Sequence, residues 1–193
     1  MSTIVDQPEH YFKQFIPERD ELLVELEAEA EREDIPITGP VVGELLYILA
    51  CAAKARRILE LGTATGYSAI YLAKACEAFN GRVVSLENDS AMATRAQQNF
   101  QRAGIAHFVE IQVKDALEAL PQMKGTFDYI FMDIEKQDYI RALPDCERLS
   151  RRLHRSARAK TPTCQKPICK RTYPSAGRLG YEMKNKYDDN STL

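Results

Sequence analysis

The chain has 193 residues, of which 45% are hydrophobic and 28% are charged, with a formal net charge of −2. These values fit one ordinary globular domain with a substantial core. No run approaches the roughly 20 apolar residues of a membrane helix, and residues 1–15 lack the pattern of a secretion signal, so we expect a cytoplasmic protein without membrane association.

The first part of the chain predicts two helices and one strand. Residues 18–33 carry leucines at helical spacing after Pro17, a residue typical of a helix start. Residues 34–40, "DIPITGP", break this pattern. Residues 41–55 predict an apolar helix that leads into a strand at 57–61.

Beyond this strand, helical stretches and strands alternate. A helix follows Gly66, and a strand at 82–86 follows an Asn-Gly turn. The next helix spans 90–104, with Ser90 near its start and Gly104 as its C-cap. The remaining predicted elements are a strand in 107–116, a short helix at 117–123, a strand in 127–134 and a helix from 139 to 149.

Such alternation predicts an α/β fold with a Rossmann-like, doubly wound, mostly parallel sheet and helices on both faces. In these sheets, ligands bind beyond the carboxyl ends of the strands, where the strand order reverses. The residues that directly follow the four predicted strands are Gly62, Glu87, Asp115 and Asp133. Three carboxylates and a glycine turn therefore share one edge, which we predict to be the functional site.

The residues at this edge predict a nucleoside ligand without phosphates. The turn from Gly62 to Gly66 has no middle glycine to cradle a pyrophosphate, and no P-loop Lys-Ser/Thr follows it. Glu87, 25 residues after Gly62, is placed to accept hydrogen bonds from a ribose diol, and Asp115 from an amine. Alternatively, the glycines form only a tight turn and Glu87 only caps a helix.

The five cysteines of the chain have no spacing typical of a disulfide framework. Cys164 and Cys169 come nearest to a zinc pattern, but no second pair accompanies them and His154 is poorly spaced. We therefore expect reduced thiols and no zinc site.

Five stretches together resemble the O-methyltransferases that depend on S-adenosylmethionine (SAM) and a divalent metal. Catechol and caffeoyl-CoA O-methyltransferases typify this family, and the similarity is greatest to its small bacterial members. The stretches are ITGPVVGELL, ILELGTATGYSA, VVSLEND, KDALEAL and FDYIFMDIEKQDY. The resemblance covers about residues 35–149 and implies the methyltransferase form of the Rossmann-like fold.

The resemblance implies SAM as cofactor and assigns residues to each of its parts. The methionine end is assigned to Thr38, Glu60, Gly62 and Ser68, with Tyr67 nearby. The ribose hydroxyls are assigned to Glu87, the adenine to Asp115 and Ala116, and the meeting point of methyl group and acceptor to Asp133.

The resemblance also implies two catalytic residues and a divalent cation, Mg²⁺ or Ca²⁺. Asp133 is assigned as a metal ligand, and Lys136 as the base that helps to deprotonate the acceptor hydroxyl. A hard cation lowers the pKa of a bound diol, and a desolvated lysine accepts the released proton. The expected acceptor is a catechol-like small molecule.

The match to the family stops near Leu149. The family carries an Asp-Asn pair of metal ligands about 26 residues after the first aspartate, whereas this chain has Ala159 and Lys160 there. Residues 1–149 hold 15 Lys and Arg against 25 Asp and Glu, and residues 150–193 hold 11 against 3. We expect a methyltransferase domain at 1–149 with an incomplete metal site and an open fourth strand, followed by a basic, non-matching tail at 150–193.

Three origins of the tail remain open: a change of reading frame near 149–150, a divergent segment that binds RNA or another acidic partner, or a solvated extension. The predicted function is SAM-dependent O-methylation. The alternatives are methylation of a hydroxylated tRNA base, SAM binding without catalysis, and a nicotinamide-dependent oxidoreductase, which the missing middle glycine disfavours. The acidic N-terminal helix and the resemblance suggest a homodimer.

Overall fold

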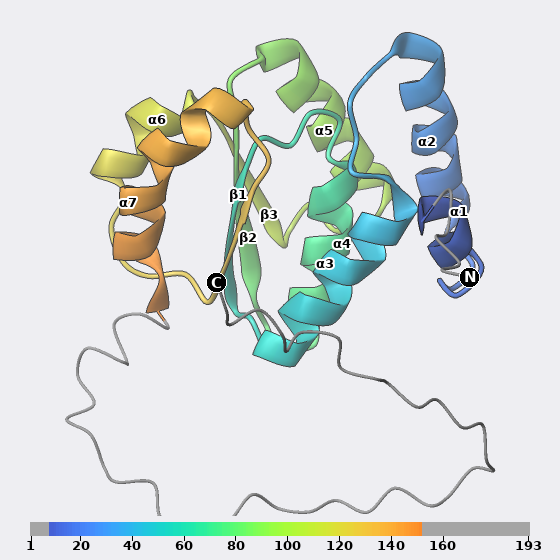
Figure 1. Cartoon of the computed structure of the whole chain (residues 1–193), viewed down its shortest axis with the longest axis horizontal. Coiled ribbons are helices and arrows are strands. Elements are labelled where there is room, and N and C mark those ends of the chain that lie inside the picture. The colour runs from blue at the N-terminus through green and yellow to red at the C-terminus, as the bar shows by residue number, and fades with distance from the viewer. Residues whose placement is uncertain (1–7, 152–193) are drawn as a thin grey trace, which may run out of the picture. The chain divides into compact units, whose positions relative to one another are not determined.

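A central sheet of four parallel strands organises residues 8–151, which are the residues that the computed structural model describes (Figure 1). The strands are β1 (Arg57–Leu61), β2 (Arg82–Glu87), β3 (Val109–Val113) and β4 (Tyr129–Met132). Their spatial order is β3-β2-β1-β4. All four strands lie where the sequence predicted them, which confirms the parallel α/β sheet.

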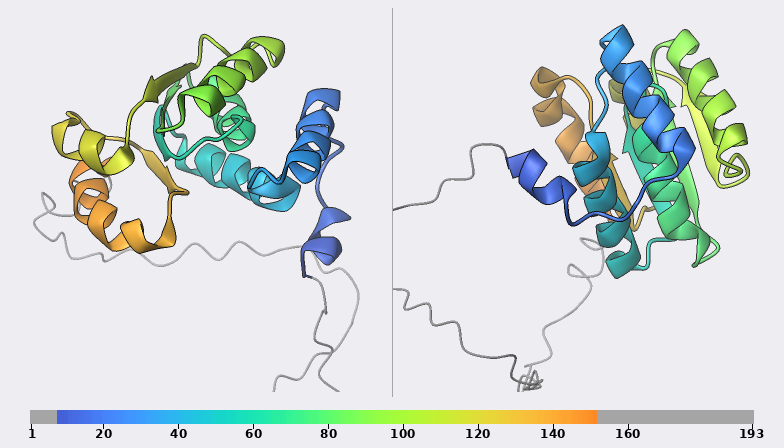
Figure 2. Two further views of the ribbon diagram at one scale, coloured as in Figure 1. Left: turned by 90° about the horizontal axis from the view of Figure 1, so that it is seen from above. Right: turned by 90° about the vertical axis from the view of Figure 1, so that its right-hand side faces the viewer.

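Helices cover both faces of the sheet, as expected for a doubly wound fold (Figures 1 and 2). One layer contains α3 (Gly39–Ala53), α4 (Tyr67–Glu77) and α5 (Ser90–Arg102). The other contains α6 (Ala116–Ala119) and α7 (Tyr139–Leu149). The other elements are α1 (Pro8–Lys13), α2 (Glu21–Glu33) and the short 3₁₀ turns η1 (Leu120–Gln122) and η2 (Lys136–Asp138).

Alternation along β1 divides the core into two clusters, because successive side chains of a strand point to opposite faces. Ile58 packs with buried residues of α2 to α5, including Leu26 and Phe100. Leu59 and Leu61 belong to the cluster on the α6 and α7 side. Glu60 points to the same face of the sheet as Ile58, so its carboxyl group is directed toward the layer that contains α3, α4 and α5.

Helix boundaries show where local patterns were insufficient. α2 begins at Glu21, so the prediction that Pro17 starts this helix is wrong, and α1 was not predicted at all. The cap of α5 is Asp89, whose side chain accepts hydrogen bonds from the backbone of Ala91 (2.7 Å) and Met92 (3.2 Å). Short exposed segments carry little periodicity, which explains these differences.

Within residues 8–151, β4 pairs with β1 and with no other named strand. Just before β4, Phe127 forms a parallel bridge with Ser150, and its N–H donates to the carbonyl oxygen of Leu149 at 2.8 Å. The predictions for the basic tail lie outside the described residues, apart from Ser150 and Arg151. In the described part of the chain, no helix combines the length and the apolarity needed to cross a membrane.

Candidate functional site

A cavity of about 990 Å³ lies beyond the carboxyl ends of the strands. The strand order reverses there, because β1 lies between β2 and β4. The cavity wall includes eight of the residues predicted from the sequence: Thr38, Gly62, Ser68, Glu87, Asp115, Ala116, Asp133 and Lys136. Glu60 and Tyr67 do not reach this wall and lie behind it.

The glycine turn after β1 is required by the packing of the protein itself. Gly62 has φ +84°, and a Cβ atom there would collide with the backbone carbonyl oxygen of Asp133. Gly66 has φ +87°, and its Cβ would lie 2.5 Å from the ring of Phe100. These glycines therefore let β1 approach the end of β4 and let α4 approach α5, while Gly62 also lines the cavity.

Glu60 is completely buried and holds the glycine turn at 62–66 in place. Its carboxylate accepts hydrogen bonds from the hydroxyls of Thr63 (2.7 Å), Ser68 (2.6 Å) and Ser85 (2.6 Å). Burial raises the pKa of Glu60, and the three hydroxyl donors oppose that rise. Glu60 itself does not line the cavity, whereas two of the residues whose hydroxyls it contacts, Thr63 and Ser68, do.

Glu87, at the end of β2, also anchors this turn. One oxygen accepts from the backbone N–H groups of Thr63 (3.1 Å) and Ala64 (2.8 Å), and the other from that of Asp89 (2.9 Å). A carboxylate offers about four acceptor positions. Glu87 therefore lines the cavity with roughly one position left for a ligand.

Asp115 caps α6 with only one of its two oxygens. Oδ1 accepts from the backbone of Leu117 (2.8 Å) and Glu118 (3.1 Å). Among the described residues, nothing donates to Oδ2. The cap thus fixes the side chain beside Ala116 and leaves one oxygen available at the cavity.

Thr38 supplies an unsatisfied polar group. Its hydroxyl oxygen is buried and has no hydrogen-bond partner among the described residues. Buried polar groups are rarely left unpaired, so this atom indicates a ligand. Thr38 ends the segment 33–38, which lines one part of the cavity and of which the sequence assigned only Thr38 to the site.

Asp133 and Lys136 line the cavity beyond β4 and remain exposed. The carboxylate of Asp133 accepts no hydrogen bond from the described residues, and the partial burial of this group raises its pKa. Over the whole wall, seven acids face two lysines. This excess of negative charge suits a cationic ligand.

Tyr67 lies beneath α2, away from the cavity wall. Its hydroxyl donates to Glu27 at 2.7 Å, and Glu27 also accepts from Arg19 at 2.7 Å. Burial is the main cause of the raised pKa of Tyr67. Tyr67 thus fastens α2 to α4, and its contribution to a ligand would be indirect.

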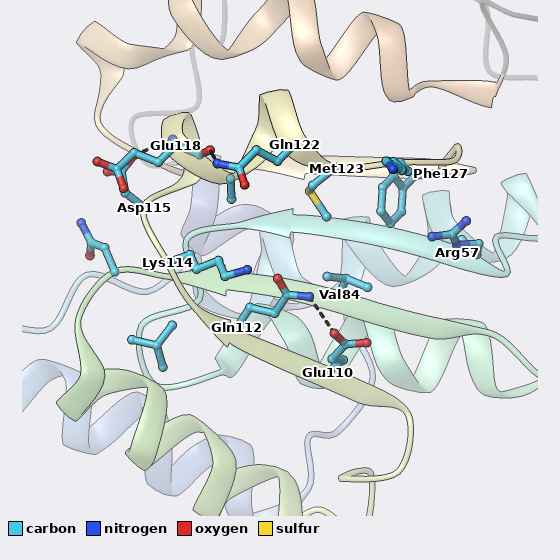
Figure 3. A pocket seen from close by; sticks show the side chains of 14 residues that line it. Arg57, Val84, Glu110, Gln112, Lys114, Asp115, Glu118, Gln122, Met123 and Phe127 are labelled. Carbon is cyan, nitrogen blue, oxygen red and sulfur yellow. Dashed lines mark hydrogen bonds between the residues drawn. The ribbon is translucent and has the colours of Figure 1, made fainter.

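A second groove, of about 850 Å³, runs along the sheet beneath α6 and η1 (Figure 3). It extends from Arg57, beside Phe127, to Lys114 and Asp115, where it meets the first cavity. A hydrogen bond of 2.6 Å joins Gln112 to Glu110 on its floor. Of the predicted site residues, only Asp115 belongs to this groove.

The O-methyltransferase family profile matches residues 16–153. The chain belongs to the O-methyltransferase family. This confirms the family that the sequence motifs indicated.

Curated relatives include catechol O-methyltransferases of Niastella koreensis and Mycobacterium tuberculosis. The first is 37% identical over 154 residues, with 77% of this chain and 69% of the relative covered. The second is 43% identical over 111 residues, and this chain spans half of its length. An O-methyltransferase of Streptomyces achromogenes, solved in complex with SAM, is 34% identical, with a TM-score of 0.68 over 77% of this chain and 71% of that one.

The described residues do not fit a divalent metal. Within 8–151, no group of three or more His, Cys, Asp or Glu side chains is arranged to hold an ion. Asp133 offers one carboxylate, whereas Mg²⁺ or Ca²⁺ takes six or more oxygen ligands.

Proposed function

We propose that this chain binds SAM in the cavity beyond the strand ends and that its site serves transfer of the methyl group to a hydroxyl of a catechol-like small molecule. Catechol O-methyltransferases are among its relatives, and a solved relative holds SAM. Residues of the family motifs line this cavity.

The buried hydroxyl of Thr38 is the observation that carries the proposal. An oxygen without a partner beside an acidic cavity calls for a ligand that is both cationic and rich in hydrogen-bonding groups. SAM has a sulfonium, an ammonium, a carboxylate and a ribose diol. Its methionine end would meet Thr38 and Ser68.

Three acidic side chains contact the remaining parts of the cofactor. Glu87 accepts from a ribose hydroxyl through its remaining acceptor position, and the second ribose hydroxyl has to find another partner. Asp115 accepts from the adenine amine through Oδ2, beside Ala116. Asp133 places its negative charge near the sulfonium.

Methyl transfer itself requires an acceptor oxygen in line with the methyl carbon and the sulfur. The hydroxyl attacks as its proton leaves, the methyl carbon forms a bond to this oxygen, and the carbon–sulfur bond breaks with its electrons on sulfur. Lys136 also lines this cavity, and we assign to it the removal of the proton from the acceptor hydroxyl.

A calorimetric titration with SAM, with and without Mg²⁺, tests the proposal. We expect the same affinity for SAM with and without Mg²⁺, because none of the proposed contacts to SAM involves a metal. Thr38→Val should weaken SAM binding by about tenfold while leaving the free protein equally or more stable, since it removes an unpaired buried hydroxyl. Thr94→Ala, which removes an exposed hydroxyl on α5, is the matched control.

SAM binding without catalysis is the second candidate. It is favoured by the lack of a three-ligand metal group in the described part and by Ala159 and Lys160 in the sequence. A methylation assay with catechol and SAM separates the candidates: turnover that Lys136→Met abolishes supports the enzyme. Tight SAM binding without any product supports the second candidate instead.

A further inference from the structure

Ion pairs join the C-terminal end of α2 to α5, which lies beside it (Figure 2). Arg95 of α5 donates to the carboxylate of Glu29, and also to that of Glu33 at 2.9 Å. The two glutamates are four residues apart in the sequence and therefore project from the same side of α2. One guanidinium thus bridges the last turn of this helix.

The end of α2 continues directly into the segment 33–38 that lines the cavity. α2 ends at Glu33, and the N–H of Ile35 donates back to the carbonyl oxygen of Ala30 at 2.9 Å, which closes the helix. Thr38, with its unpaired buried hydroxyl, lies only five residues beyond Glu33. Because so short a connection transmits movement, the position of Thr38 depends on the position of the helix end.

The segment 33–38 has few other anchors. Its residues are exposed or half-buried, and among them only Ile37 packs against a core cluster. Within the part of the chain that the structure describes, Arg95 is the one side chain outside α2 that hydrogen-bonds to the segment. A cleft of about 300 Å³, lined mostly by charged and polar residues, lies between α2 and α5. The ion pairs therefore span a gap that apolar packing does not fill.

The helix α5 also borders the cavity at its own start. Met92, three residues before Arg95, belongs to the cavity lining. The N–H of Asp89, the cap of α5, donates to Glu87 at 2.9 Å. α5 is thereby tied to the ribose end of the proposed cofactor site, and Arg95 ties the segment at the methionine end to the same helix.

We propose that Arg95 is a positioning residue of the cofactor site. By holding Glu29 and Glu33, it fixes the end of α2, and the segment 33–38 then keeps its hydroxyl group at the cavity. This inference rests on the proposed binding of SAM and adds a residue that itself does not line the cavity. Arginine suits the role because its planar group donates to two carboxylates at once, whereas a lysine ammonium is a compact point charge.

The ion pair with Glu33 persists at neutral pH. The hydrogen bond from Arg95 holds the pKa of this carboxyl group below its usual value, so that the group is ionised when SAM binds.

Calorimetric titration of the full chain with SAM tests the proposal. Arg95→Met should weaken SAM binding by about fivefold, the upper end of what an exposed ion pair contributes, and Arg95→Lys should recover part of the affinity. Arg102→Met is the matched control, because Arg102 joins the same two helices through Glu25, about two turns before the end of α2. We expect this control to change the affinity by less than about twofold.

A double-mutant cycle distinguishes positioning from general support of the fold. Because Arg95 acts through the hydroxyl of Thr38, Arg95→Met should cost less than about twofold in affinity when Thr38→Val is already present. An equal loss in both backgrounds would overturn the inference. So would an unchanged affinity of Arg95→Met, or an equal loss caused by Arg102→Met.

Hydrogen exchange of the free chain separates this inference from the proposed function. Arg95→Met should raise the exchange rate of the peptide that contains residues 33–38, whereas Arg102→Met should not. If the wild-type chain failed to bind SAM, the proposed function would fall, and the exchange would still decide whether Arg95 holds the segment. Unchanged exchange in Arg95→Met would overturn that role. Circular dichroism establishes that each variant is folded.

Discussion

The neighbouring ends of β1 and β4 present two carboxylates in opposite surroundings. Glu60 on β1 is fully buried and accepts from three hydroxyls at 2.6 to 2.7 Å. Asp133 after β4 is exposed at the cavity and accepts from none of the described residues. In the sequence, both residues are acids near the end of an apolar strand.

The difference between Glu60 and Asp133 distinguishes a carboxylate that supports the fold from one that is available to a ligand. A carboxylate whose acceptor positions are filled by the protein holds a turn in place, whereas a carboxylate without donors is available to a ligand. Burial raises the pKa of both groups, but only Glu60 has hydroxyl donors to oppose that rise. Substitutions at these positions can test whether support and binding are separate.

Gly62→Ala should break the arrangement that holds the two strand ends together. The left-handed backbone and the collision with the carbonyl of Asp133 should lower the free energy of unfolding by about 3 kcal/mol. Urea denaturation measures this loss. Gly104→Ala is the control: its φ is +71° but its surroundings are open, so we expect a loss of about 1 kcal/mol.

Glu60→Gln should change the pH dependence of stability. Because the folded pKa of Glu60 is raised above 4.5, its protonated form stabilises the fold at low pH, and this contribution is lost as the pH rises through the raised pKa. Glutamine does not titrate, so the stability of the variant does not fall in this way. Its stability relative to wild type should therefore increase with pH above 4.5, as urea denaturation at several pH values can show.

If the free energies of unfolding of Glu60→Gln and wild type differed by the same amount at every pH in this range, Glu60 would not titrate in the folded protein. Glu31→Gln, at an exposed position of α2, should follow the wild-type curve.

Asp133→Asn should affect the ligand and leave the fold intact. We expect a change in the free energy of unfolding of less than about 0.5 kcal/mol, since the side chain is exposed. SAM affinity should fall by about tenfold, the effect of losing one charge beside a sulfonium. Calorimetry with SAM measures the second effect, and unchanged affinity would exclude Asp133 from the cofactor site.

Ser85→Ala should lower the free energy of unfolding by only about 1 kcal/mol, because Glu60 keeps the hydroxyls of Thr63 and Ser68. SAM affinity should change by less than about threefold, because Ser85 does not reach the cavity wall. Thermal unfolding and calorimetry together check both statements. A large loss of affinity would show that support and binding are not separable here.

From the sequence one could predict the strands, their parallel arrangement and the edge of the sheet at which the cavity lies. Strand periodicity and the glycine turn are local signals, and the acids that follow three strands share an edge in any parallel sheet. The motif residues could therefore be placed together at one cavity. Pro17 and the unpredicted α1 show the limit of such signals in short exposed segments.

The contacts of each of these residues, by contrast, depend on the tertiary structure. Gly62 approaches the carbonyl of Asp133 because β4 lies beside β1, and Glu60 is enclosed because Ser85 on β2 lies on its other side. For the same reason, segment 33–38 lines the cavity, and one apolar side of α3 is covered by no residue within 8–151. These facts depend on which elements are neighbours in space, and no local pattern in the chain encodes that.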